Sequence, residues 1–204
     1  MLVFAERLLT DRMKSVDNDV RRCTEFENIE FMRHSQPAPF PAVCYCFATI
    51  DLLGALYAGN ATKYRDSTSQ SRKYMTDFMK YPYDTADLLQ ELFRHRVVHL
   101  AQPHPSLTRN GKRIAWRLHM PTNGELHLRL DDLEPESPIR KYILTSNLTL
   151  EWDQEFHLSI RDFCDDIVNS VDRKDGGYRQ TLRVNTELQT NFDNAVRVIY
   201  SQSG

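Results

Sequence analysis

The chain is poor in glycine and proline, with 7 and 9 of them in 204 residues, and this scarcity argues against a disordered protein. It contains no run of about eighteen apolar residues, so no transmembrane span and no membrane partner are expected. A secretory signal layout is also missing, because acidic and basic residues follow the short apolar start at once. With 41% hydrophobic and 26% charged residues, the sequence predicts a globular, cytoplasmic protein forming a single domain over residues 1–204.

Cysteine is scarce too, and its spacing excludes the common cysteine-based sites. Of the four cysteines, Cys44 and Cys46 lie two residues apart, which fits neither a zinc motif nor a redox motif. Free cysteines are among the residues most often buried in proteins. All four are therefore expected to be reduced residues that line helices.

Acidic residues are absent from residues 92–124, although the whole chain carries a net charge of −2. The basic residues of this stretch are Arg94, Arg96, Arg109, Lys112, Arg113 and Arg117. A local cationic field in a mildly acidic chain favours an anionic partner, and phosphate is the commonest one. A solvated basic face with no partner remains the alternative.

Hydrophobic periodicity predicts four helices in residues 1–102, over about 2–28, 42–59, 67–82 and 84–100. The second of these is apolar almost all round, which is typical of a helix in the middle of a bundle. Pro41 stands at its start and Gly59 at its end, where such residues act as helix signals. The fourth is expected to stop before Pro103.

Strand-like alternation follows in residues 103–157. Residues 114–120 and 126–130 alternate, the Asn123-Gly124 pair between them signals a hairpin, and residues 142–152 offer a third strand. Two helices are expected in residues 158–204, the first capped by Ser159 and the second running from about Tyr178 to Ile199. The predicted fold class is mainly α (α+β): a four-helix bundle with an appended small antiparallel β-sheet and two C-terminal helices.

The segment "LFRHRVVHLAQPHP", residues 92–105, concentrates histidine and arginine at the end of the fourth predicted helix. His95 and His99 share a helix face, being four residues apart. Arg94 lies five residues before His99, about 140° away around the helix axis. Arg94 and His99 can meet only where the helix end is irregular or where the arginine reaches round.

"LFRHRVVHL" resembles the signature of the HEPN superfamily, in which Arg, four to six residues and then His close the last helix of a four-helix bundle. Arg94 and His99 match this pattern, and the resemblance covers about residues 1–102. A second Arg-to-His match, Arg113 with His119, falls on a predicted strand and lacks this context.

The resemblance implies an RNA-binding homodimer, and in active members a metal-independent endoribonuclease of toxin or defence type, with an antitoxin or another protein as a partner. By this analogy His99 moves protons during attack by the ribose 2′-OH, and Arg94 holds the phosphate. His95 and Arg96 widen the anion site. The residues expected to guide the RNA strand are Arg109, Lys112 and Arg113.

Three alternatives stay open at this point. A non-catalytic, dimerising binding or assembly module of the same fold is the first, because fold does not determine activity. The second is a metal site built from His95, His99 and His104, which the neighbouring arginines disfavour. The third is a structural role for the histidines at the helix end. The leading interpretation needs no cofactor and no metal.

Overall fold

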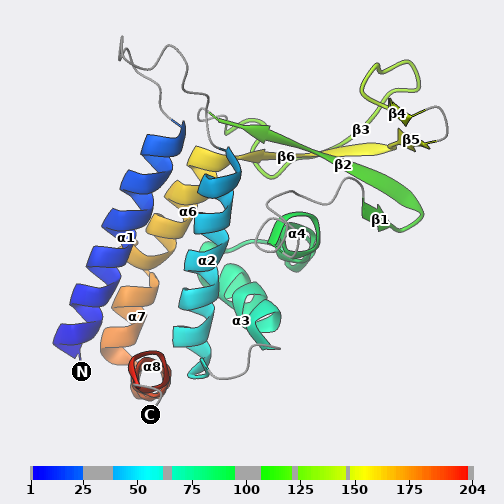
Figure 1. Cartoon of the computed structure of the whole chain (residues 1–204). Helices are drawn as coiled ribbons and strands as arrows, with labels where there is room; N and C mark the ends of the chain where they lie inside the picture. Colours follow the sequence, from blue (N-terminus) through cyan, green and yellow to red (C-terminus); the bar gives the residue numbers. More distant parts are fainter. Residues whose placement is uncertain are drawn as a thin grey trace, which may run out of the picture.

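The computed structural model describes residues 2–24, 39–61, 66–94, 107–120, 124–145 and 148–201, with the backbone alone for residues 142, 144, 145 and 148. The predicted fold class is confirmed: the protein is mainly α, with a small β-sheet beside the helices (Figure 1). Three long helices, α1 (Leu2–Thr24), α2 (Pro39–Ala58) and α6 (Ile160–Asp172), lie side by side. The sheet extends away from one end of this helical layer.

Helix α2 lies at the centre of the helical layer, with α1, α3, α6 and α8 packed around it. This position explains why its sequence is apolar nearly all round. Gly59 adopts the left-handed conformation (φ 73°) at its end, as the sequence predicts. By length and composition α2 could also cross a membrane, but a central core helix meets the same criterion.

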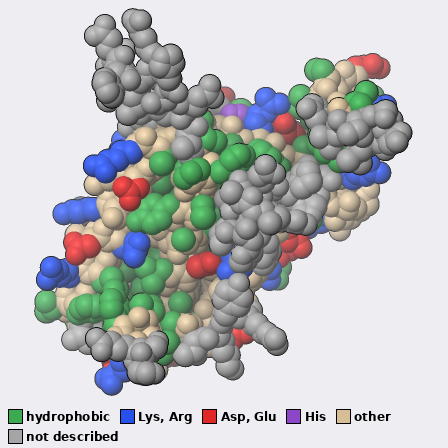
Figure 2. Space-filling view, viewed as in Figure 1, with side chains coloured by type: hydrophobic (Ala, Val, Ile, Leu, Met, Phe, Trp, Pro, Cys, Tyr) green, Lys and Arg blue, Asp and Glu red, His purple; other side chains and the backbone are tan. Residues whose placement is uncertain are grey.

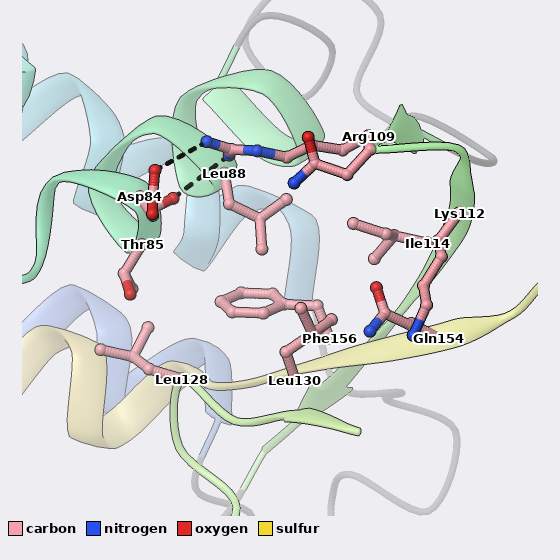
Figure 3. A pocket seen from close by; sticks show the side chains of 11 residues that line it. Asp84, Thr85, Leu88, Arg109, Lys112, Ile114, Leu128, Leu130, Gln154 and Phe156 are labelled. Carbon is pink, nitrogen blue, oxygen red and sulfur yellow. Dashed lines mark hydrogen bonds and ion pairs between the residues drawn. The ribbon is translucent and has the colours of Figure 1, made fainter. Parts of the chain in front are cut away.

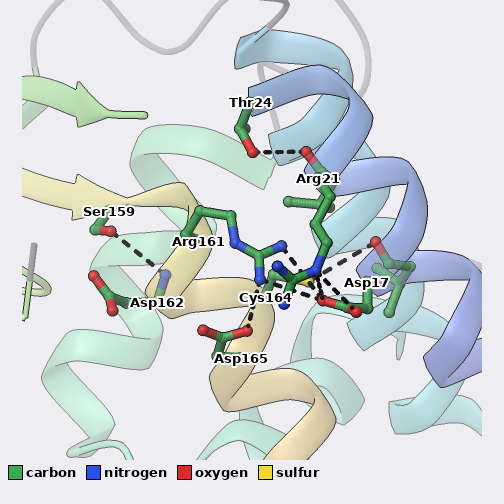
Figure 4. A network of polar contacts seen from close by, with 10 residues as sticks. Asp17, Arg21, Thr24, Ser159, Arg161, Asp162, Cys164 and Asp165 are labelled. Atoms are coloured by element: carbon green, nitrogen blue, oxygen red, sulfur yellow. Dashed lines mark hydrogen bonds and ion pairs between the residues drawn. The ribbon is translucent and has the colours of Figure 1, made fainter. Parts of the chain in front are cut away.

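Helix α6 belongs to the same layer as α1 and α2, so the C-terminal segment helps to form the bundle. Leu9, Met13 and Val16 of α1 recur at helical spacing and are buried, as are Phe163 and Ile167 of α6. The contact between α1 and α6 includes a polar network of Asp17, Arg21, Arg161 and Asp165 (Figure 4). Arg161 is 5% exposed, and its Nη2 atom lies 3.3 Å from Asp17 of α1 and 3.2 Å from Asp165.

Two further helices pack on the other side of α2, and each ends in a π-helical turn. Helix α3 (Ser67–Tyr74) continues into η3 (Met75–Met79), and α4 (Tyr83–Leu89) continues into η4 (Gln90–Arg94). Lys80, in the left-handed conformation (φ 64°), ends the first pair. Residues 95–106 lie outside the described residues.

The sheet is mixed rather than wholly antiparallel, which corrects the prediction. Its strand order is β1 (Leu107–Arg109), β2 (Lys112–His119), β6 (Gln154–Ser159), β3 (Leu130–Asp132), and β2 and β6 are parallel. Residues 126–128 form a turn, not a strand, and residues 142–152 contribute to a separate pair, β4 (Lys141–Thr145) with β5 (Leu148–Glu151).

Strand β6 alternates in sequence, with Phe156 and Leu158 between Glu155, His157 and Ser159, but it is buried on both faces. Asn110 and Gly111, both with positive φ, join β1 to β2 as a two-residue hairpin turn. The hairpin predicted around Asn123-Gly124 is wrong, because β2 and β3 are not neighbours: β6 lies between them and pairs with both. Residues 121–123 lie outside the described residues.

The C-terminal segment contains three helices where two were predicted. The expected helix from Tyr178 to Ile199 is divided into α7 (Tyr178–Val184) and α8 (Thr186–Tyr200). Asn185 separates them in an extended conformation, and its side chain accepts a hydrogen bond from the Leu188 N–H at 3.0 Å. An asparagine N-cap thus starts a new helix at a place where apolar periodicity alone indicated a single continuous helix.

The four cysteines are free, as predicted, and Cys46 and Cys164 are buried between helices. Hydrogen bonding to Cys164 and burial raise the pKa of the Cys46 thiol well above its usual value. Cys46 is therefore protonated and unreactive at neutral pH.

Candidate functional site

Arg94, the predicted phosphate-binding residue, is the last residue of η4 and is buried. Its Nη2 atom donates to Asp51 Oδ2 at 2.9 Å and to Ser67 Oγ at 2.6 Å. Nε donates to the same Asp51 oxygen at 3.2 Å, and Nη1 donates to Thr68 Oγ1 at 3.3 Å. The guanidinium is therefore held in one orientation by groups from α2 and α3.

Asp51 is the acidic partner in this group, which we call the Arg94 cluster: Asp51, Ser67, Thr68, Ser71 and Arg94. The other Asp51 oxygen, Oδ1, accepts a hydrogen bond from Ser71 Oγ at 2.5 Å. A buried ion pair is held by such additional hydrogen bonds, which compensate its loss of hydration. The cluster joins three helical segments at the place where η4 ends.

Gly54 allows α2 and α3 to approach closely enough to form this cluster. A Cβ atom at position 54 would lie 2.8 Å from the Gln70 carbonyl carbon and 2.8 Å from the Ser71 nitrogen. Both are backbone atoms, which cannot move aside as a flexible side chain can. Gly54 lies one helical turn after Asp51, so the close approach places Ser71 beside the carboxylate.

The other residues of the HEPN-like motif, His95, Arg96 and His99, lie outside the described residues, as does His104. Whether Arg94 and His99 face one space stays a prediction. Among the residues that the structure does describe, no group of three or more His, Cys, Asp or Glu side chains could hold a metal ion.

Two of the three residues predicted to guide RNA come together at the rim of one cavity. Arg109 and Lys112 flank the β1–β2 turn, and both line a cavity of about 390 Å³ between α4 and the sheet (Figure 3). Arg113 follows Lys112 on β2, so its side chain leaves from the opposite face of the sheet. It therefore does not belong with the other two.

Both rim cations are paired with carboxylates. Arg109 Nη2 lies 3.0 Å from Asp84 and 3.2 Å from Asp87, both on α4, which ties the β1–β2 hairpin to that helix. Lys112 Nζ lies 2.7 Å from Asp132 on β3. The hydrogen bond from Lys112 lowers the pKa of the Asp132 carboxyl, which keeps it ionised.

A second polar group, which the sequence did not predict as a unit, lies on the sheet: His119, His157, Asp131 and Glu155. His119 Nε2 and His157 Nδ1 are 3.0 Å apart, and His157 Nε2 lies 3.3 Å from Asp131 and 3.5 Å from Glu155. Because His157 Nε2 faces two carboxylates, it carries the proton, and Nδ1 then accepts from His119. Burial lowers the pKa of both imidazoles.

The second Arg-to-His match, Arg113 with His119, does not form a site. The two residues stand near opposite ends of β2, about 20 Å apart at the rise of an extended strand. Only the first match has its arginine, Arg94, on a helix.

Asp51 and the His119–His157 pair are the polar features that sequence reasoning missed. A signal for Asp51 was available, since it is the only charged residue of α2, and a lone charge in an apolar helix needs a buried partner. No comparable signal marked His157, because its pairing with His119 depends on the parallel register of β2 and β6.

Comparison of the chain with protein-family models, with curated proteins and with solved structures found no match in any of the three.

Proposed function

We propose that this chain is a HEPN-like, cytoplasmic RNA-binding protein that cleaves RNA without a metal, as a toxin or defence ribonuclease. The observation that carries the proposal is Arg94: a buried arginine, oriented by its hydrogen bonds, on the helix where the family's motif expects one. The adjoining cavity, with Arg109 and Lys112 at its rim, supports RNA binding beside it.

In this proposal Asp51 is a positioning residue, and Arg94 and His99 act on the phosphodiester. Hydrogen bonds between charged groups are about twice as strong as neutral ones. An incoming phosphate would therefore displace Ser67 or Thr68 from the guanidinium before it displaced Asp51. Arg94 then stabilises charge on the phosphate, while His99 takes the proton of the attacking 2′-OH.

Dimerisation belongs to the same proposal and rests on a face of α2 that the described residues leave partly exposed. Two residues of this face, Pro41 and Ala48, are exposed. Three of its other residues are only partly buried: Cys44, Tyr45 and Leu52. Figure 2 shows hydrophobic side chains gathered over α1 and α2 on this side of the molecule. The face ends beside Asp51, so a second copy bound there would bring two Arg94 clusters close together.

A second candidate is a non-catalytic, dimerising binding module. The observation that favours it is the pairing of Arg94 within its own chain: its positive charge is offset by Asp51. An arginine satisfied in this way stabilises the bundle whether or not RNA is bound.

The test is cleavage of RNA by the purified protein in the presence of a chelator. The wild type is expected to cleave, and His99→Ala is expected to lose cleavage while keeping its thermal stability. Equal cleavage by His99→Ala would reject the mechanism. If no RNA is cleaved and the protein is a stable dimer by light scattering, the binding module is supported instead.

The dimer face has its own matched pair of variants. Ala48→Arg places a charge on the partly exposed face of α2 and is expected to give a monomer by light scattering. Val184→Arg is the control, because Val184 is 81% exposed on α7, away from this face. A wild-type protein that is monomeric at high concentration would contradict the dimer.

A further inference from the structure

The cavity between α4 and the sheet has an apolar floor that is formed from three directions (Figure 3). Leu88 comes from α4, Ile114 from β2 and Phe156 from β6, while Leu128 and Leu130 close the side next to β3. Leu88, Ile114 and Phe156 also belong to the hydrophobic core, so the floor is fixed by the packing of the protein. An apolar surface of this kind favours a flat, weakly polar group over a hydrated ion.

The rim of the cavity carries hydrogen-bonding groups of every kind. Lys112 and Arg109 supply positive charge, Asn110 and Gln154 supply amides, and Asp84 supplies a carboxylate. Lys112 uses one of its three N–H donors on Asp132. The site therefore offers donors and acceptors around an apolar floor. Because Arg109 is paired with Asp84 and Asp87, and Lys112 with Asp132, a phosphate would bind by sharing or displacing these ion pairs.

Leu128 adds an observation of a different kind. Its φ is +58°, in the left-handed region that residues other than glycine rarely adopt. Conformations of this kind persist only where the surrounding structure imposes them, and they cluster at binding and active sites. Here the strained residue contributes its side chain to the wall of the cavity.

The position of the cavity relates it to Arg94. Leu88 lies six residues before Arg94 on the same continuous helix, about 9 Å along the axis at the ordinary helical rise. The two side chains point in different directions, because six residues at about 100° each leave them about 120° apart around the helix axis. The cavity thus opens on another side of the helix from the Arg94 cluster, and an RNA strand bound at both would pass around the helix.

We propose that this cavity binds one nucleotide of single-stranded RNA, with the base on the apolar floor and a phosphate at Lys112 and Arg109. This deepens the proposed function and rests on it. Single-stranded RNA is recognised through bases held on apolar or aromatic surfaces and hydrogen-bonded at their edges. Amide and carboxylate side chains are the groups that pair with base edges, and Asn110, Gln154 and Asp84 line this cavity. Gln154 Nε2 already donates to Asp132 at 2.8 Å, so its carbonyl oxygen is the group left for a base edge.

The experiment is a calorimetric titration of the full chain with the four nucleoside 5′-monophosphates, with adenosine and with ribose 5-phosphate. At least one monophosphate is expected to bind at millimolar concentration or better, and more tightly than ribose 5-phosphate. Binding of ribose 5-phosphate as tight as that of every nucleotide would overturn the base-binding role of the floor. Failure of all four nucleotides to bind would overturn the proposal itself.

Variants locate the two halves of the nucleotide. Lys112→Ala is expected to weaken binding of the preferred monophosphate about tenfold, one charge-assisted contact, and to leave adenosine binding unchanged. Gln154→Leu is expected to weaken nucleotide and nucleoside alike. Lys174→Ala is the charge-matched control, since Lys174 is exposed in the turn between α6 and α7. An equal loss with Lys174→Ala would indicate non-specific attraction and would reject the site.

Failure of this proposal is distinguishable from failure of the ribonuclease. A protein that binds nucleotides in the cavity but cleaves no RNA keeps the nucleotide site and loses the catalytic function. If RNA is cleaved but Lys112→Ala and Gln154→Leu leave nucleotide affinity and cleavage unchanged, the catalytic function stands and the cavity is not its base site.

Discussion

Asp51→Ala is the substitution that tests the Arg94 cluster most directly. It removes the only carboxylate that the structure pairs with Arg94 among the described residues and leaves the guanidinium charge at the end of η4. Breaking a buried ion pair by removing one partner costs about 3–5 kcal/mol, because the remaining charge is neither hydrated nor neutralised.

The degree of burial places the expected cost within this range. The Arg94 side chain is 10% exposed and that of Asp51 is 23% exposed, so some water can reach the site after the substitution. We therefore expect a loss of about 3 kcal/mol in the free energy of unfolding, the lower end of the range. For a domain of this length this corresponds to a fall of about 6–12 °C in Tm.

The assay is urea denaturation followed by circular dichroism at neutral pH, with Asp11→Ala as the matched control. Asp11 forms an exposed i,i+4 pair with Arg7 on α1, with side chains 67% and 84% exposed. Its removal is expected to cost less than about 0.5 kcal/mol. If Asp51→Ala costs no more than Asp11→Ala, the ion pair does not contribute to stability and the reasoning is refuted.

A double-substitution cycle separates the pair from its surroundings. Arg94→Met replaces the guanidinium with an apolar side chain, so adding it to Asp51→Ala removes the charge that had lost Asp51. We expect the double variant to be more stable than Asp51→Ala alone. A purely additive loss would show that the two residues stabilise the protein independently.

The remaining predictions concern helix packing, pH and capping. Gly54→Ala is expected to cost about 1–3 kcal/mol, because its Cβ would overlap the α3 backbone, whereas Gly124→Ala, with no atom within 4 Å, should cost far less; equal losses in denaturation would contradict this. Burial lowers the pKa of His119 and His157 in the folded protein. Just below pH 6.5 the unfolded chain therefore binds more protons than the folded chain. We expect Tm to fall as the pH drops through that value towards the lowered pKa values. This fall should be smaller in His157→Gln, and an unchanged profile would exclude the histidines as its cause. Asn185→Ala is expected to lose about 1 kcal/mol through the missing α8 cap, and no change in urea denaturation would argue against capping.

Most of the helices could be predicted because helical periodicity is a local property. The buried faces of α1 and α6 recur every three or four residues, and Gly59 ends α2 where the sequence indicates. The capping residue of α6, Ser159, was identified from its pattern, and its side chain accepts a hydrogen bond from Asp162 N–H. Asn185 was missed because apolar residues keep helical spacing on both sides of it.

The sheet could be predicted only in part. Strand β2 was predicted from its alternation, whereas β6 was missed although Phe156 and Leu158 alternate with polar residues over a shorter stretch. Its parallel pairing with β2 joins residues about forty positions apart, and no local pattern encodes that register.

The candidate site divides along the same line. By itself, the sequence determined that Arg94 would lie on the helix containing α4 and that this part of the chain would be cationic, since both depend on residue type and spacing. Only the tertiary structure decided that Arg94 is neutralised by Asp51 and that Lys112 and Arg109 share a cavity while Arg113 does not. Those outcomes depend on how close α2 and α3 approach at Gly54 and on which face of β2 meets α4. Both features depend on packing between segments far apart in the chain, and the periodicity of a sequence does not predict such packing.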